Sequence, residues 1–217
     1  MKTAAETGRL RRVATARMPT KWGMFHATGF ERTVANGISR AECALAIVMG
    51  SQMAEAPLLR IHSQCFTGEA LGSLRCDCGD QLSMAMQAIA SEGRGLVIYE
   101  YEEGRGIGLT AKLQAYELQD AGLDTVEANH ALGFKADSRD FGLSAAILRD
   151  LGVSRVRLLT NNPRKVRALS DTGIEVMALI PCEAAPNPYS ARYLWAKKEK
   201  MGHLLTLRQL DWTDELQ

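Results

Sequence analysis

The sequence has almost no excess of charge of either sign. Its 26 Lys and Arg residues are balanced by 25 Asp and Glu residues, which gives a formal net charge of +1 with the four His neutral. A chain without a basic field is not expected to bind nucleic acid as a bulk partner, so any anion site must be local. Long hydrophobic runs are also lacking, and none approaches the ~20 residues of a bilayer span. We therefore expect neither nucleic acid nor a membrane as a partner.

The sequence shows no internal repeat, no low-complexity tract and no evident linker. Its length of 217 residues predicts one large domain, or one domain with a small appendage. The basic start from Met1 to Arg17 contains Glu6 and no hydrophobic stretch, so it is not typical of a secretory signal. A cytoplasmic location is the resulting expectation.

The predicted secondary structure changes in character near Arg60. Before Arg60, three strands are predicted, at 22–27, 43–49 and 57–62, with glycine-containing turns between them. After Arg60, short β-branched runs at 96–99, 156–159 and 174–178 alternate with helical patterns at 79–90, 109–122, 141–151 and 164–171. In the second helix, Leu109, Leu113 and Tyr116 mark the predicted inner stripe. We predict an α+β fold: a mixed sheet with a mostly β N-terminal third and an alternating α/β remainder.

Five cysteines are present, and three of them are crowded into one strand-loop-helix unit. Cys65, Cys76 and Cys78 follow the spacing C-x10-C-x-C. Three thiolates can converge on one zinc ion and leave its fourth position for water or substrate, whereas a fourth ligand such as His62 would close the site. The alternatives are small buried hydrophobic residues or a redox pair. The other two cysteines, Cys43 and Cys182, are interpreted as structural.

Two strand-to-helix turns have the composition of local anion sites. The segment 102–108 contains three glycines and Arg105, so its backbone N–H groups and a guanidinium could approach phosphate oxygens. The segment 158–165 places Asn162 at a helix N-cap and a proline at N1, with Thr160 and Lys165 flanking the helix start. A tight turn without a ligand and an ordinary capped helix are the alternatives.

Asp137 and Arg139 form a third candidate pair, ahead of the helix at 141–151. A carboxylate two residues from an arginine can be a general base or can position the guanidinium. From the residues alone, a solvated loop or an N-cap is the favoured interpretation. Tyr116 is most simply a tyrosine at the edge of the core with a satisfied hydroxyl.

Taken in order, several segments resemble GTP cyclohydrolase II. The motifs are Arg60-Ile61-His62-Ser63-Gln64-Cys65, then 73–79, 103–108, 126–130 and 159–163, with further similarity at 187–188 and 200–205, so that the resemblance spans about 11–205. It implies a single domain over 1–217, with residues 1–10 flexible and 206–217 as a C-terminal tail, in a cytoplasmic homodimer. That family opens the imidazole ring of GTP and releases formate and pyrophosphate. The product is 2,5-diamino-6-(5-phosphoribosylamino)pyrimidin-4-one, at the first step of riboflavin biosynthesis.

The resemblance also implies roles for individual residues. One Zn²⁺ per chain would bind Cys65, Cys76 and Cys78, and Mg²⁺ would accompany the triphosphate. Asp137 would accept a proton, Arg139 would take the nucleotidyl phosphate, and Tyr116 would assist ring opening. The residues implied to contact GTP are Arg60, Ile61, His62, Ser63, Gln64, Gln81, Glu103, Gly104, Arg105, Thr125, Thr160 and Lys165.

Two features bear on this expected chemistry. A guanidinium with a pKa above ~12 has no free lone pair, so electrostatic stabilisation by Arg139 competes with covalent transfer. In addition, Tyr101 and Glu102 stand where many family members have Arg-Gln, which places a carboxylate beside an expected polyanion. The alternatives are a specialised paralogue that retains the formylated intermediate or serves another pathway, a non-catalytic zinc or nucleotide sensor, and a Cys76/Cys78 redox pair.

Overall fold

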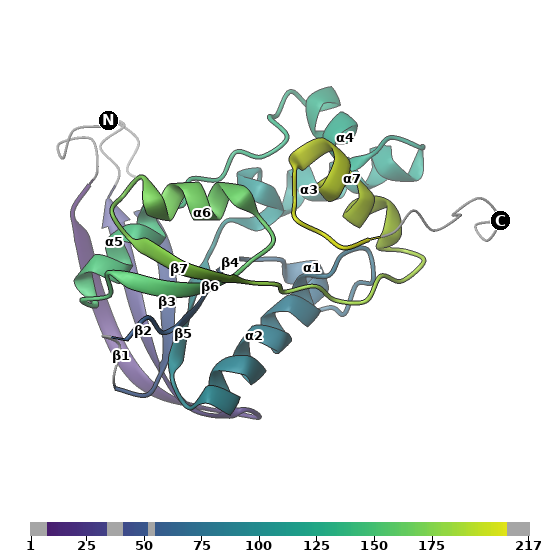
Figure 1. Cartoon of the computed structure of the whole chain (residues 1–217). Coiled ribbons are helices and arrows are strands. Elements are labelled where there is room, and N and C mark those ends of the chain that lie inside the picture. Colours follow the sequence, from purple (N-terminus) through teal and green to yellow (C-terminus); the bar gives the residue numbers. More distant parts are fainter. Residues whose placement is uncertain (1–7, 34–40, 52–54, 208–217) are drawn as a thin grey trace.

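A computed structural model describes residues 8–33, 41–51 and 55–207 and contains a seven-stranded sheet with helices on both faces (Figure 1). The strands lie in the order β1-β2-β3-β5-β4-β6-β7. Their bounds are β1 (Leu10–Thr20), β2 (Gly23–Thr33), β3 (Ala41–Met49), β4 (Leu58–Ser63), β5 (Gly95–Glu100), β6 (Arg155–Leu159) and β7 (Glu175–Ile180).

The sheet has an antiparallel half and a parallel half. Strands β1, β2, β3 and β5 pair antiparallel, whereas β4 runs parallel to both β5 and β6, and β6 runs parallel to β7. This mixed sheet confirms the predicted α+β class. Strand β1 was not predicted, because most of its side chains are exposed and its sequence carries no apolar alternation. Its pairing with β2, from Leu10 opposite Arg32 to Thr20 opposite Gly23, defines it instead.

Helices cover both faces of the sheet and lie beside one end of its strands (Figure 1). Helix α2 packs on one face, α5 and α6 pack on the other, and the remaining helices gather beside one end of the strands. The prediction missed α1, α4, α7 and the 3₁₀ turn η1. The bounds are α1 (Phe66–Glu69), α2 (Cys78–Glu92), η1 (Glu103–Gly106), α3 (Leu109–Asp120), α4 (Thr125–Ala131), α5 (Gly142–Asp150), α6 (Pro163–Ser170) and α7 (Ala191–Met201).

The predicted inner stripe of α3 was wrong. Leu109 and Leu113 are 37% and 52% exposed, and the buried residues of this helix are Lys112 and Ala115. The reason is that α3 turns its inner face toward a polar pocket rather than toward the apolar core. A lysine with a carboxylate partner is therefore buried in place of leucine.

The alternation of side chains along β4 sets up the site. Leu59 and Ile61 belong to the core cluster that includes α5, whereas Leu58 belongs to the cluster on the α2 face. Because successive strand residues point to opposite faces, Arg60 and His62 also point to the α2 face. Both are buried, at 4% and 2% exposure. A core strand thus delivers two polar side chains to one side of the sheet.

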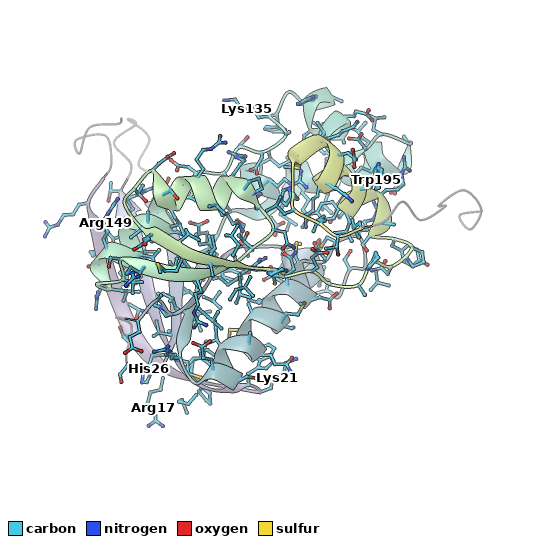
Figure 2. All side chains as sticks on the ribbon, in the orientation of Figure 1. Arg17, Lys21, His26, Lys135, Arg149 and Trp195 are labelled. Atoms are coloured by element: carbon cyan, nitrogen blue, oxygen red, sulfur yellow. The ribbon has the colours of Figure 1, made fainter. Side chains whose placement is uncertain are left out.

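Figure 2 labels side chains on two opposite sides of the molecule. Arg17, Lys21 and His26 lie around the β1–β2 hairpin, while Lys135 and Trp195 lie at the opposite side, near α4 and α7. Within the described ranges, no helix has the length and apolar character to cross a membrane. Residues 1–10 were predicted to be flexible and residues 206–217 to form a C-terminal tail. Of these, residues 1–7 and 208–217 lie outside the described residues.

Candidate active site

A pocket opens at the carboxyl ends of three neighbouring strands. Arg60 and His62 of β4, Glu103 after β5 and Thr160 after β6 all line it. Carboxyl ends of parallel strands are the usual ligand-binding edge of such a sheet. The pocket contains about 1080 Å³ of empty space, its open mouth included. The sequence-predicted site residues that line it are Arg60, His62, Ser63, Gln64, Cys65, Cys76, Cys78, Gln81, Glu103, Gly104, Arg105, Tyr116, Thr125, Arg139, Thr160 and Lys165.

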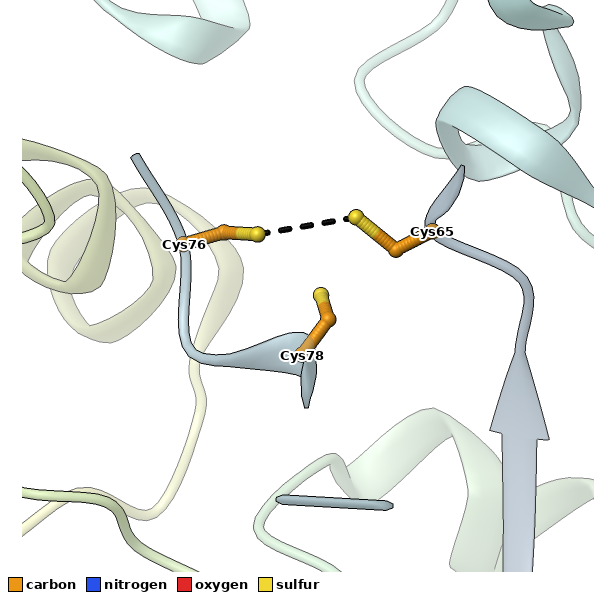
Figure 3. A group of neighbouring side chains, drawn as sticks. All are labelled: Cys65, Cys76 and Cys78. Carbon is orange, nitrogen blue, oxygen red and sulfur yellow. Dashed lines mark hydrogen bonds between the residues drawn. The ribbon is translucent and has the colours of Figure 1, made fainter. Parts of the chain in front are cut away.

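The three clustered cysteines converge in this pocket (Figure 3). Their Sγ atoms all lie within 4.8 Å of one another, and Cys65 Sγ is 3.5 Å from Cys76 Sγ. His62 is not a fourth member, because its Nε2 lies 2.9 Å from Glu69 Oε1 instead. The same Glu69 oxygen accepts the backbone N–H of Cys65 at 2.7 Å. Among the described residues, the cluster therefore contains three sulfur atoms and does not include His62, which was the alternative fourth ligand.

The electrostatics of the cluster favour a cation at its centre. Hydrogen bonds with Cys76 and Cys78 and the charge of Lys112 lower the pKa of Cys65, despite its burial. The pKa of Cys76 is raised to about 11 by the hydrogen bond of Cys76 with Cys65 and by burial. The pKa of Cys78 is raised as well. Without a cation, only one of the three sulfurs can readily be a thiolate. Three sulfur donors at this spacing fit a soft divalent ion such as Zn²⁺.

Glu103 ties the glycine turn to the cysteine loop. Its Oε2 accepts the backbone N–H of Phe66 at 2.6 Å, and its Oε1 accepts the Lys112 ammonium at 2.7 Å. Lys112 Nζ also lies 3.2 Å from Cys65 Sγ. Both carboxylate oxygens therefore have partners inside the protein, and Oε1 also accepts the backbone N–H of Gly104 at 3.0 Å. Gly104 and Arg105 adopt left-handed conformations there, with φ of 61° and 60°.

A chain of buried polar contacts crosses the floor of the pocket. Arg60 Nη2 donates to Gln81 Oε1 at 2.5 Å, and Gln81 Nε2 donates to Asp77 Oδ2 at 2.6 Å. Lys197 Nζ of α7 completes the chain by donating to Asp77 Oδ1 at 2.6 Å. The charge of Lys197 keeps the pKa of Asp77 below its usual range even though burial acts in the opposite direction. This chain of contacts links β4, α2 and α7 beside the three-cysteine cluster.

Asp137 and Arg139 form a buried ion pair rather than the solvated loop favoured from the sequence. Arg139 Nε and Nη2 donate to the two carboxylate oxygens at 2.9 and 2.8 Å, and Arg164 Nη1 lies 2.8 Å from Oδ2. Although burial raises it, these arginines lower the pKa of Asp137 to about 2. Arg139 lines the pocket and also donates to Ser63 Oγ at 3.2 Å. Asp137 thus lies behind Arg139 and orients it.

The turn after β6 carries a buried ammonium into the pocket. Asn162 caps α6 by accepting the backbone N–H of Arg164, as predicted, and Lys165 Nζ donates to the carbonyl of Ile61 at 2.8 Å. Burial and the charges of Arg60 and Arg139 lower the pKa of Lys165 well below its usual value. The side chain of Ile61 faces the core, so only its backbone belongs to the site.

Tyr116 stands beside the sulfur cluster, on α3. Its hydroxyl lies 3.3 Å from Thr67 Oγ1, which confirms the expectation of a satisfied hydroxyl. Thr67 Oγ1 in turn lies 3.8 Å from Cys65 Sγ. Burial raises the pKa of Tyr116, so the phenol stays protonated.

Buried polar atoms without a partner are concentrated in this pocket. Among the described residues, six buried side-chain atoms have no hydrogen-bond partner, and five of them belong to pocket-lining residues: Arg60 Nε, His62 Nδ1, Glu102 Oε2, Arg105 Nη2 and His203 Nδ1. Leaving such groups unpaired is costly, so their concentration marks this pocket as a place for water or a polar ligand.

Comparisons with known proteins show the family of the chain. The family model of GTP cyclohydrolase II matches residues 11–181. The chain belongs to the GTP cyclohydrolase II family. It is 53% identical over 197 residues to the GTP cyclohydrolase-2 proteins of Escherichia coli O9:H4 strain HS and strain K12 / DH10B, covering 90% of this chain and 98% of each relative. The chain is therefore an enzyme of this class.

A solved structure gives only a weak likeness. A two-domain 3,4-dihydroxy-2-butanone 4-phosphate synthase from A. baumannii aligns with a TM-score of 0.44 and 19% identity, over 81% of this chain and 40% of that one.

Several pocket residues of this family member were missed from the sequence. Lys112, Tyr193 and Lys197 line the pocket from α3 and α7, and His203 and Leu205 line it from the segment after α7. The Lys200–Leu205 motif contains the last two, but nothing in its composition shows that a C-terminal segment returns to the sheet edge. Only the tertiary fold brings these residues to the site.

Proposed function

We propose that this enzyme hydrolyses GTP at two places, opening the imidazole ring with release of C8 as formate and removing pyrophosphate. The product is 2,5-diamino-6-(5-phosphoribosylamino)pyrimidin-4-one, at the entry to riboflavin biosynthesis. The observation that carries this proposal is a pocket that contains the three-sulfur cluster together with several cationic side chains. The purine would lie near the sulfurs and the triphosphate at the cationic end, defined by Arg105, Arg139, Lys165 and Lys197.

Cys65, Cys76 and Cys78 would hold one Zn²⁺ per chain. Such an ion lowers the pKa of a bound water toward ~7, which supplies a nucleophile for the electron-poor C8. The side chains around the ion would orient the guanine base and donate or accept protons. Tyr116 reaches the cluster as a protonated phenol. It is suited to donate a hydrogen bond to a group on the reacting carbon.

Phosphates would bind among Arg105, Arg139, Lys165 and the N-terminus of α6. Arg139 is held by Asp137, whose hydrogen bonds raise the pKa of the guanidinium although burial opposes this. A guanidinium that stays protonated stabilises a transferring phosphoryl group by charge and does not attack it. With a pKa of about 2, Asp137 is a weak base, so we assign it mainly to positioning Arg139.

The other residues implied by the family resemblance take contact roles. Thr125 stands at the start of α4, which Asp124 caps, and Thr160 precedes α6. Gln81 and Arg60 would meet the guanine edge, and the Arg105 guanidinium, whose Nη2 is unpaired, would reach the nucleotide from the glycine turn. A homodimer, a Mg²⁺ ion on the triphosphate and a cytoplasmic location remain predictions.

The test measures three products from one reaction. The purified protein is incubated with GTP, Zn²⁺ and Mg²⁺, and formate, pyrophosphate and the pyrimidine are quantified separately. We expect equimolar amounts of all three. Pyrophosphate with a formylated product and no formate would identify a paralogue that retains the intermediate. Absence of any turnover by zinc-loaded protein that binds GTP would favour the sensor alternative and contradict the proposal.

A further inference from the structure

The segment that follows α7 crosses the pocket as an extended strap, defined here as residues 202–207. Gly202 ends α7 in the left-handed conformation, with φ of 64°. The residues after it alternate in burial, with His203 and Leu205 turned inward to line the pocket and Leu204 59% exposed. This alternation is the pattern of an extended chain that covers a cavity with one face.

Hydrogen bonds fix the strap at several points. The backbone N–H of Leu204 donates to the carbonyl of Asn161 at 2.8 Å, beside the turn that leads into α6. The backbone N–H of His203 donates to the backbone carbonyl of Lys197 at 3.1 Å. Thr206 donates to the carboxylate of Glu183 from both its N–H and its hydroxyl. The strap is therefore a built wall of the pocket.

The His203 imidazole faces the cationic end of the pocket with one nitrogen unpaired. Its Nδ1 is buried and has no hydrogen-bond partner. The cations that act on it come from four different parts of the fold: Lys197 of α7, Arg105 of η1, Arg139 of the 137–140 loop and Lys165 of α6. Burial and these charges lower the pKa of His203 to about 3, so the ring is neutral in the free protein. Four surrounding cations attract an anionic ligand, and a neutral imidazole in the tautomer with its proton on Nδ1 can donate to an oxygen of that ligand.

We infer that His203 is a further substrate-binding residue, which donates a hydrogen bond to a phosphate oxygen of the nucleoside triphosphate from the C-terminal strap. This inference rests on the proposed function, because it takes the triphosphate as the occupant of the cationic end. It adds a ligand that neither the two anion-binding turns nor the cysteine cluster supplies. A hydrogen bond to a charged phosphate contributes more than one between neutral groups.

The test separates the phosphate from the base by using three probes. Calorimetry on the zinc-loaded full chain measures binding of inorganic triphosphate, of a non-hydrolysable GTP analogue and of guanosine. His203→Phe keeps the ring shape and removes both nitrogens. We expect it to weaken binding of inorganic triphosphate and of the analogue by about 10-fold or more, and to leave guanosine binding unchanged.

Two further variants control for packing. His203→Asn places an amide group near the position of Nδ1, so we expect it to recover most of the triphosphate affinity. Leu204→Ala changes the exposed neighbour on the same strap and is expected to bind all three probes like wild type. Thermal unfolding of each variant shows whether the fold is kept. If His203→Phe is unfolded, His203→Ala takes its place, with the same expected loss of triphosphate affinity and the same unchanged guanosine binding.

The outcomes distinguish this inference from the proposed function. Unchanged triphosphate affinity in a folded His203→Phe would overturn the role of His203 alone. An equal loss for guanosine would place the imidazole at the base or ribose and would also overturn it. Tight triphosphate binding by wild type without any GTP turnover would contradict the proposed function and leave the His203 contact standing.

Discussion

At the scale of single residues, Cys76 is the simplest test of the sulfur cluster. Its thiol lies 3.5 Å from that of Cys65 and is buried with it. Replacing it by serine exchanges a soft donor for a hard one, so Cys76→Ser should lose stoichiometric zinc and ring opening together. Elemental analysis and formate release measure the two effects.

The matching control for this variant is Cys182→Ser. Cys182 is buried near Gln81 but lies outside the three-sulfur cluster. We expect it to keep one zinc per chain. Full turnover by a zinc-free Cys76→Ser protein would refute the role of the cluster in catalysis.

Glu102 is one of the two residues expected to depart from the family pattern, and it lines the pocket with Arg139. Burial and the charge of Glu100 raise its pKa to about 7. Its carboxyl is therefore neutral below pH 7 and charged above it, when it repels phosphate. We expect Glu102→Gln to lower KM for GTP at pH 8 by roughly 5-fold, about 1 kcal/mol, and to match wild type near pH 6.

Steady-state kinetics at the two pH values measure this effect of Glu102. Since GTP and other groups also titrate in this range, the quantity to compare is the ratio of the wild-type KM to the variant KM at each pH. Glu117→Gln, an exposed change on α3, serves as the control. A ratio that is the same at pH 6 and pH 8 would show that the Glu102 carboxyl does not act through its charge.

At the scale of elements, the short helix α1 holds a glycine against the sulfur atoms. A Cβ added at Gly68 would lie 2.9 Å from Cys76 Sγ and 3.3 Å from Cys65 Sγ. One of the two thiols must then move, and metal geometry tolerates little displacement. We expect Gly68→Ala to weaken zinc binding by about 10-fold or more, as measured by competition with a chromophoric chelator.

Gly29→Ala, on strand β2, is the control for Gly68→Ala. A Cβ added at Gly29 would lie at an ordinary 3.8 Å from Val13 of β1. This variant should bind zinc like wild type. Unchanged zinc affinity in Gly68→Ala would mean that the cluster is looser than its packing indicates.

The elements with strong apolar periodicity could be predicted from the sequence, and the others could not. Helix α2 buries Ala85, Met86 and Ile89 at helical spacing, as the pattern indicated. Helices α3 and α7 instead bury Lys112 and Lys197 against carboxylates. A buried lysine looks like an exposed one in sequence, because only its partner from a distant element justifies the burial.

The candidate site shows the same division. Residues within the motifs were found because each motif is local in sequence, and sixteen of the eighteen implied residues line the pocket; Ile61 and Asp137 do not. The alternation of β4 explains Ile61, and the ion pair with Arg139 explains Asp137. The strap residue His203 depended on long-range folding, which composition does not encode locally.

At the scale of the whole molecule, the joint between the antiparallel and parallel halves of the sheet contains a buried carboxyl whose protonation affects global stability. Glu100 ends β5, is 1% exposed, accepts the Ser144 hydroxyl at 2.6 Å and has its other oxygen unpaired. Burial raises its pKa from 4.5 to about 7, against the opposing effect of Ser144, Lys165 and Arg139. The folded protein therefore holds this proton more tightly than the unfolded chain does.

The sign of the pH dependence follows from that difference. Stabilisation by the bound proton is complete below pH 4.5 and is lost as pH rises through 7, to a total of about 3 kcal/mol at 1.36 kcal/mol per pKa unit. Glu100→Gln stays neutral at every pH and escapes this loss. Relative to wild type, its free energy of unfolding in urea should therefore improve by a few kcal/mol between pH 5 and pH 8. Glu199→Gln, an exposed change on α7, should show no such trend. A constant difference between Glu100→Gln and wild type across this range would mean that Glu100 is ionised in the folded protein, with Lys165 and Arg139 as its counter-charges.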